Sequence, residues 1–399
     1  MHYRNTSNIK RREGRKVPKK GKKVVNTSQK PFDFTLCIVI FLLLALGIVM
    51  VLSASAPSSL STTGNSYTYV IKQAGFAVVG IVLMFIISKI DYRIYKNFYK
   101  IAYVASIIAL LSVAIPGIGV NVKVATRWID LGFGSFQPSE LAKIGLIVFY
   151  AGYLTEHKNE LGFFWKGCIK SFCFLIPPIA ILFFLQDHLS ASIVIVAIIS
   201  IMMIMAGTKL KHFLGIAFAG GSAAAAGMLL LATMSDKGSF RLARLTTFLN
   251  PWADPTGDGW QVIQGLYAIG SGGLFGVGLG QSKQKYLYIP EPHNDFIFAI
   301  IAEELGFVGC LVVIALFAIF IWRGILTSMK APDSFGSLLA VGITSLVGIQ
   351  AIINIAVVTS SMPATGMSLP FFSYGGTALL ILLCCMGILL NISRAGSKV

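Results

Sequence analysis

Ten apolar runs follow one another along the chain, and each could cross a lipid bilayer. They lie at about 34–56, 68–88, 101–116, 138–154, 171–186, 189–206, 212–232, 296–321, 336–360 and 374–392. A span needs about 20 apolar residues, so the shorter runs must tilt or continue as helix into the headgroups. Hydrophobic residues make up 55% of the chain, more apolar surface than a soluble domain of this size buries. We predict an all-α polytopic protein with ten transmembrane helices, its membrane domain covering 34–392.

The segment before the first apolar run is strongly basic. Between Arg4 and Lys30 it holds eleven Lys or Arg residues against the single acidic residue Glu13. A basic tail can bind nucleic acid, but a disordered cytoplasmic arm over residues 1–33, lying on anionic lipid, is the simpler interpretation. We therefore expect no nucleic-acid partner.

Lysine and arginine are unevenly distributed among the short connections, and this bias predicts the orientation of the bundle. With the N-terminus in the cytoplasm, the inner connections hold Lys89, Arg93, Lys96, Lys100, Lys158, Lys166, Lys170, Lys209, Lys211, Arg323, Lys330, Arg394 and Lys398. The short outer connections hold only Lys123 and Arg127. Ten spans return the C-terminus to the cytoplasm, where residues 393–399 form a tail.

Three polar segments, at 117–137, 233–295 and 361–373, then fall on the outer face. The second is a large extracellular loop between the seventh and eighth predicted helices. ATP and NADH are absent on that side of the membrane. A reaction there would need a substrate that arrives already activated, and no nucleotide cofactor.

Polar residues gather where the first outer segment enters the fourth predicted span. Arg127 and Trp128 suit the headgroup level, where a cation meets phosphate and an indole lies at the interface. Pro138 favours the first turn of a helix, which Gln137 or Ser139 could cap.

Glu140 and Lys143 follow three residues apart, on one face of that helix and just inside the membrane boundary. Two charges that faced lipid would be costly, so both are expected to face the interior. They form either an ion pair that orients the helix or part of a polar pocket open to the outer face.

A polar break at 186–190 separates the fifth and sixth runs on the outer side. Asp187 could simply cap the helix that follows. His188 alone is too little to identify a ligand of any metal or substrate.

The large loop contains a glycine-rich run at 270–280 that superficially resembles a phosphate-binding loop. It has no surrounding βαβ unit and no Lys-Ser/Thr pair, so a nucleotide site is rejected. The glycines instead predict close backbone packing or a re-entrant segment buried in protein. Earlier in the loop, Arg241 and Arg244 could meet one phosphate group, or be solvated surface.

The loop ends in Pro290-Glu-Pro-His-Asn-Asp295, directly before an apolar run. Asp295 could be a helix cap, where the helix dipole stabilises its ionised form. Glu303 and Glu304 follow two turns deeper in the same predicted helix. Three carboxylates are more than capping requires, which favours a functional site.

The last outer loop ends in Ser373-Tyr374-Gly375-Gly376, at the start of the tenth run. Hydroxyls and free amides at a helix start could bind an anion, although the pattern alone is weak.

Four ordered motifs, RWIDLG…QPSELAK, DPTGDGWQ…GSGGLFGVGLGQSKQK, PEPHNDFIFAIIAEELG and SLPFFSYGG, extend over nearly the whole chain past residue 34. In these motifs the sequence resembles the SEDS family of FtsW, RodA and SpoVE. The wording QSKQKYLYIPEPHNDF is closer to the FtsW and SpoVE branch than to RodA.

The resemblance implies a ten-helix peptidoglycan glycosyltransferase of the bacterial cytoplasmic membrane, which polymerises lipid II at the outer leaflet. It implies a role at the division septum or in the spore cortex, with elongation left open. The expected partners are lipid II, a class B penicillin-binding protein that crosslinks the strands, and other membrane proteins of the division complex.

By motif, Asp295 matches the essential aspartate of the family, and Arg127, Gln137, Glu140 and Lys143 match its polar cavity. Asp295 is expected to be the base for the acceptor's 4-hydroxyl, or to hold a divalent cation such as Mg²⁺ or Mn²⁺. One attack opposite the leaving group would invert the anomeric centre.

Arg127, Lys143 and Arg244 would stabilise the departing pyrophosphate. The other candidates for contact with substrate are Trp128, Gln137, Ser139, Glu140, Gln261, His293 and Ser373. The chain departs from the family where many members have Pro-Asp-Leu-Gly-Thr and this one has Asp187 to Ala191. His188 is therefore given no catalytic role.

Two other functions remain open. A lipid II flippase would need polar residues along a path through the bilayer, whereas here they cluster on one face. A non-catalytic scaffold of the division complex would make no glycan from lipid II.

Overall fold

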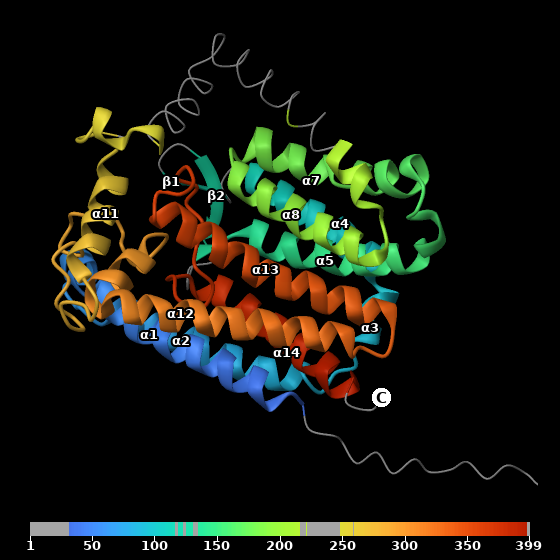
Figure 1. The fold of residues 1–399 in the computed structure, drawn as a ribbon, viewed down its shortest axis with the longest axis horizontal. Coiled ribbons are helices and arrows are strands. Elements are labelled where there is room, and N and C mark those ends of the chain that lie inside the picture. Colours follow the sequence, from blue (N-terminus) through green and yellow to red (C-terminus); the bar gives the residue numbers. More distant parts are fainter. Residues whose placement is uncertain are drawn as a thin grey trace, which may run out of the picture.

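The computed structural model describes residues 32–115, 119–122, 125–130, 135–215, 221, 248–257 and 259–396. Long helices form a bundle, with a small sheet toward one end of it (Figure 1). Its first elements are α1 (Phe34–Thr63), α2 (Thr68–Ile87), α3 (Arg93–Asn97), α4 (Tyr99–Leu111), η1 (Ser112–Ala114), β1 (Gly119–Val122), β2 (Ala125–Asp130), β3 (Ser135–Phe136), α5 (Pro138–Glu156) and η2 (Lys158–Glu160). There follow η3 (Phe164–Ile169), α6 (Lys170–Cys173), α7 (Ile176–Ala180), η4 (Ile181–Leu185), α8 (Leu189–Ala206), η5 (Pro251–Ala253), α11 (Trp260–Gly272), α12 (Ile297–Met329), α13 (Ser334–Val358) and α14 (Gly376–Gly396).

Seven of the described helical segments are long and apolar enough to cross a membrane. They are α1, α2, the stretch Phe164–Leu185, α8, α12, α13 and α14, and each overlaps a predicted span. The chain is therefore a multi-pass membrane protein. The predicted 138–154 span coincides with α5, and the 101–116 span with the shorter α4 and η1. Most of the 212–232 run, like most of the basic arm at 1–33, falls outside the described residues, so the count of ten stays a prediction.

Local sequence explains where the long helices begin and end. The Asp33 carboxylate accepts a hydrogen bond from Leu36 N at 3.0 Å and caps α1. Gly64, with φ of 71°, ends that helix in the left-handed conformation that glycine adopts readily. Asp333 caps α13 in the same way, accepting from Gly336 N at 2.8 Å.

The segments predicted to share a face of the membrane gather at the same end of the bundle. The start of α1, α3, the connection between α12 and α13, and the end of α14 lie together at one end (Figure 1). There Arg323 pairs with Asp33, and Arg93 pairs with Asp333. The strands and α11 lie toward the opposite end (Figure 1).

The outer segment before α5 contains an antiparallel sheet in the order β1-β2-β3. Its register pairs Val120 with Trp128 and Ile129 with Phe136. The expectation of an all-α protein is wrong in this respect. The β-branched and aromatic residues of this segment suit a strand, and the sheet satisfies backbone groups that an open loop would leave to water.

The helix α12 is broken at Gly306, where φ is 68° and ψ is −166°. Residues of the glycine-rich run fill the break. Phe307 N donates to Gly273 O at 2.9 Å and Val308 N to Leu274 O at 3.1 Å. In return, Val277 N donates to Glu303 O at 2.9 Å and Gly278 N to Glu304 O at 3.1 Å. The predicted close backbone packing of the glycine run is confirmed.

Replacing Gly306 by alanine should lower the free energy of unfolding by about 2 kcal/mol or more, because this backbone conformation is almost restricted to glycine. An added Cβ would also lie 2.2 Å from Gly276 N. Gly270→Ala is the matched control, since Gly270 lies in α11 with open space around it. Thermal unfolding of the detergent-solubilised protein measures both, and equal midpoints would contradict this account of the break.

Candidate functional site

Asp295 lies two residues before the first helical residue of α12, whose N-cap is Phe296. The interpretation of Asp295 as the cap residue is therefore wrong. Its backbone carbonyl accepts a hydrogen bond from Asn354 Nδ2 at 2.7 Å, and the same amide donates to Met367 O at 2.6 Å. The side chain of Asp295 is half-buried, with Oδ2 3.8 Å from where a Cβ on Gly366 would lie. The carboxylate thus faces the last outer loop.

Ser373 and Tyr374 tie that last outer loop to the segment that carries Asp295. The Ser373 hydroxyl donates to Asn294 O at 2.6 Å and accepts from Leu369 N at 2.7 Å. Tyr374 N donates to His293 O at 2.8 Å. The predicted site residue Ser373 is thus engaged with two backbone partners and positions this segment.

The loop also reaches the start of α8, where Arg127 is anchored. Ser190 Oγ donates to Thr365 O at 2.6 Å, one residue before Gly366. Arg127 Nε donates to Gln186 O at 3.0 Å, and its second nitrogen donates to Asp187 O at 2.5 Å. A chain of contacts therefore connects the Arg127 guanidinium to the neighbourhood of the Asp295 carboxylate, although they are far apart in sequence.

Glu140 and Lys143 form the predicted ion pair, with Lys143 Nζ 2.7 Å from Glu140 Oε1. The Lys143 side chain is 1% exposed, and that of Glu140 is slightly more open. Both therefore face the interior of the bundle. The carboxylate therefore holds the buried ammonium in a fixed position within the first turns of α5.

His188 lies against these cations. Burial first, and then the charges of Arg127 and Lys143, lower the pKa of His188 to about 3. Its Nδ1 is buried without a hydrogen-bond partner, as are Ser139 Oγ, Gln186 Oε1 and Thr365 Oγ1. Buried polar atoms without partners are rare and suit contact with water or a ligand.

The remaining predicted residues differ in their surroundings. Gln137 stands at the N-cap position of α5, as expected, but its side chain makes no capping hydrogen bond. Trp128 lies on β2, and Gln261 lies in the first turn of α11, both half-buried. Arg241 and Arg244 fall outside the described residues.

The His293 side chain is buried against two aromatic rings rather than exposed to a site. Its ring centroid lies 5.1 Å from that of Tyr69 and 5.7 Å from that of Tyr374. Burial lowers its pKa to about 4, so the imidazole is neutral near pH 7. The ring helps to hold the residues before Asp295 against α2 and the last outer loop.

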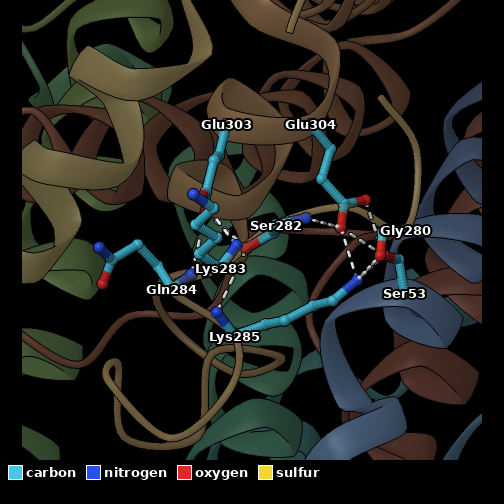
Figure 2. Close-up of polar contacts among 8 residues, drawn as sticks. All are labelled: Ser53, Gly280, Ser282, Lys283, Gln284, Lys285, Glu303 and Glu304. Carbon is cyan, nitrogen blue, oxygen red and sulfur yellow. Dashed lines mark hydrogen bonds and ion pairs between the residues drawn. The ribbon is translucent and has the colours of Figure 1, made fainter. Parts of the chain in front are cut away.

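Glu303 and Glu304 do not share an open site with Asp295. Both are buried, and they hold the segment 280–285 (Figure 2). Lys283 N donates to Glu303 Oε1 at 2.9 Å, while Lys285 Nζ lies 2.8 Å from Glu304 Oε1. The role of Lys285 was missed, and only its place in a polar run beside two membrane carboxylates could have indicated it.

Asp295 could contribute a single carboxylate to a divalent cation. Among the described residues, no three His, Cys, Asp or Glu side chains gather at metal-binding distance. Mg²⁺ is commonly held by one or two carboxylates together with substrate phosphates. The donor set therefore fits a cation shared with a phosphorylated substrate.

Comparisons with known proteins agree with this geometry. Residues 34–398 match the family described as cell cycle protein, which comprises FtsW, RodA and SpoVE. The chain belongs to this family. It is 41% identical to the stage V sporulation protein E of Bacillus subtilis, over 93% of this chain and 99% of the relative. It is 38% identical to a probable peptidoglycan glycosyltransferase FtsW of Geobacter sp. (strain M18), over 91% and 96%.

Solved structures support the same membership in the family. A chain from a peptidoglycan synthase complex, described as coordinating polymerization and crosslinking, superposes with a TM-score of 0.75 at 26% identity. That match covers 92% of this chain and 99% of the other. The rod shape determining protein RodA of Thermus thermophilus gives a TM-score of 0.65 at 26% identity, over 91% and 97%.

The two buried histidines predict a loss of stability in acid. An unfolded histidine titrates near pH 6.5, whereas His293 titrates at about 4 and His188 at about 3 in the folded protein. Their contribution to stability is complete above pH 6.5 and decreases as the pH falls toward 4, because only the unfolded chain gains protons there. The variant His293→Gln should therefore lose less stability than the wild type between pH 7.5 and pH 5. Thermal unfolding at the two pH values measures this, and identical losses would contradict the buried neutral state.

Proposed function

We propose that the protein is a peptidoglycan glycosyltransferase that polymerises lipid II into glycan strands at the outer face of the cytoplasmic membrane. The observation that carries the proposal is the connection, through Ser190, Thr365 and Gly366, between a half-buried acid and a cationic group. An acid can accept a proton, and nearby cations can stabilise a departing pyrophosphate. Relatives named as probable peptidoglycan glycosyltransferases support the assignment.

Lipid II is already activated, because its sugar leaves as a lipid pyrophosphate. The missing component is a base that removes the proton from the acceptor's 4-hydroxyl as its oxygen attacks the anomeric carbon. We assign that role to Asp295. The bond to the pyrophosphate oxygen breaks as the new glycosidic bond forms, and a single displacement inverts the anomeric centre.

The cations Arg127 and Lys143 are proposed to act on the leaving group. Both are held in place, Arg127 by two backbone carbonyls and Lys143 by Glu140. Charges that are oriented before the reaction lower the transition state without further reorganisation. The neutral His188 and the unpartnered Ser139 hydroxyl are suited to hydrogen bonds with the same group.

A divalent cation, Mg²⁺ or Mn²⁺, would supply a further positive charge shared between the Asp295 carboxylate and a substrate phosphate. With the cation bound, this carboxylate would orient the substrate rather than act alone. No nucleotide cofactor is proposed.

Neither a lipid II flippase nor a non-catalytic scaffold explains the placement of the charged residues as well. In the described part of the chain, ion pairs lie toward the two ends of the bundle, as Asp33–Arg323 and Glu140–Lys143 illustrate. A flippase would instead need polar groups along a continuous path. A scaffold would have no need of an acid that faces an outer loop bonded to the segment that anchors a cation.

The proposed partner is a class B penicillin-binding protein, together with other membrane proteins of the division complex. The similar solved chain comes from a complex named for both polymerization and crosslinking. Similarity to FtsW and SpoVE favours the division septum or the spore cortex as the place of action.

The test is polymerisation of lipid II by the purified protein, with a divalent cation and with or without the crosslinking partner. Asp295→Asn should make no detectable polymer while keeping the unfolding midpoint of the wild type. The control is Asp254→Asn, an exposed outer-loop carboxylate that should keep full activity. Full activity of Asp295→Asn would remove Asp295 from the mechanism, and an inactive wild type with its partner present would favour the scaffold.

A further inference from the structure

Two contacts between α1 and α12 lie at two heights along the bundle, and the distance between these heights is about the thickness of the hydrocarbon core of a bilayer. At one end, Arg323 Nε donates to Asp33 Oδ2 at 2.9 Å, and at the other, Ser53 Oγ donates to Glu304 Oε2 at 2.6 Å. Counted along α1 or along α12, the two levels are separated by about 30 Å, at 1.5 Å per residue. The hydrocarbon core of a bilayer is also about 30 Å thick. Ser53 and Glu304 therefore lie at the hydrocarbon boundary of the end that carries Asp295.

The segment 272–280 crosses this boundary and turns back. The helix α11 descends beside the start of α12, because Gly265 packs on Phe296 and Gly272 on Ala302. The backbone of Leu274 then bonds to Val308, which lies four residues after Glu304, past the break at Gly306 and therefore deeper in the hydrocarbon. The chain returns through Gly278, which bonds to Glu304 itself.

Immersed backbone needs partners within the protein, and the bonds from Gly273, Leu274, Val277 and Gly278 to α12 are continued by polar contacts of the returning chain at 280–285. Lys285 Nζ donates to Gly280 O at 2.7 Å and to Ser53 Oγ at 3.1 Å, besides pairing with Glu304 (Figure 2). Ser282 N donates to Glu304 Oε1 at 3.2 Å, and the Ser282 hydroxyl donates to Glu303 at 2.5 Å. Two buried carboxylates and one buried ammonium thus replace water around an irregular backbone.

The tip of the segment is apolar and open. Leu274 is 65% exposed and Phe275 is 79% exposed. On α12, which crosses the membrane, the neighbouring side chains of Phe307, Val308 and Leu311 are also exposed. Because Leu274 bonds to Val308, its apolar surface continues the lipid-facing surface of α12 rather than forming a separate patch.

We propose that residues 273–279 form a re-entrant segment that dips into the outer leaflet, with Leu274 and Phe275 in contact with the acyl chains of bulk phospholipid. This contact fixes the start of segment 280–295 at the membrane surface. The same segment ends at Asp295. The proposal does not depend on the catalytic activity. The predicted orientation of the chain decides only whether this leaflet is the outer or the inner one.

The test places the photoreactive residue benzoylphenylalanine at Phe275 in the full chain, reconstituted in vesicles of phosphatidylethanolamine and phosphatidylglycerol. Leu287 is the matched control, since it is 71% exposed and apolar but lies farther along the returning chain, toward Pro290. Phe307 on α12 is the positive control for lipid contact. After illumination, mass spectrometry counts phospholipid adducts at each position.

Phe275 should give phospholipid adducts at a level similar to Phe307, and at least fivefold more than Leu287. Equal, low yields at Phe275 and Leu287 would overturn the proposal, because the tip would then lie in water. Adducts of Phe275 with a second protein chain, or with a polyprenyl lipid alone when one is added to the vesicles, would also overturn it. The measurement is repeated at Leu274, so that a local defect at one position does not decide the result.

Discussion

A polar backbone cannot enter a bilayer unless its N–H and C=O groups find partners within the protein. The segments around Asp295 illustrate how this chain meets that constraint. The residues around Asp295 belong to irregular segments close to the membrane, and side chains supply the hydrogen bonds that regular structure would otherwise provide. Asn354 binds two carbonyls, Ser373 bridges two segments, and Glu303 receives backbone amides of the segment at 280–285. These buried polar groups make an irregular outer region compatible with a membrane bundle.

The same constraint explains the charges of the site. Lys143 is buried with Glu140 and Lys285 with Glu304, so each ammonium has its carboxylate within 3 Å. An unpaired charge at these depths would be costly, whereas a paired one keeps a fixed position. The Arg127 guanidinium is held instead by the carbonyls of Gln186 and Asp187 at the break before α8. The fixed positions of these cations thus result from the partners that the chain supplies to charges it buries.

Part of this arrangement could be predicted from the sequence. Apolar runs located the spans, because length and hydropathy act locally, and the spacing of Glu140 and Lys143 placed both on one helix face. The position of Asp295 at the start of an apolar run also followed from local order.

Contacts between distant segments could not be predicted. Nothing near Arg127 indicates the carbonyl of Asp187 as its partner, and a lone glycine such as Gly306 is common within membrane helices. The three-stranded sheet was also missed, because its strands are short and irregular.

The position of Asp295 before α12 sets the height of its carboxylate above the hydrocarbon core. Asp295 precedes Glu304 by nine residues, most of them in the first turns of α12, so its carboxylate stands farther from the hydrocarbon than Glu304 does. A bond cleaved beside that carboxylate must be held above the acyl chains on a polar spacer of matching length. In the proposed activity, the protein would measure the length of its donor's spacer as well as recognise the sugar. A sugar carried on a longer spacer would present the wrong bond to the acid, however well the sugar itself fitted.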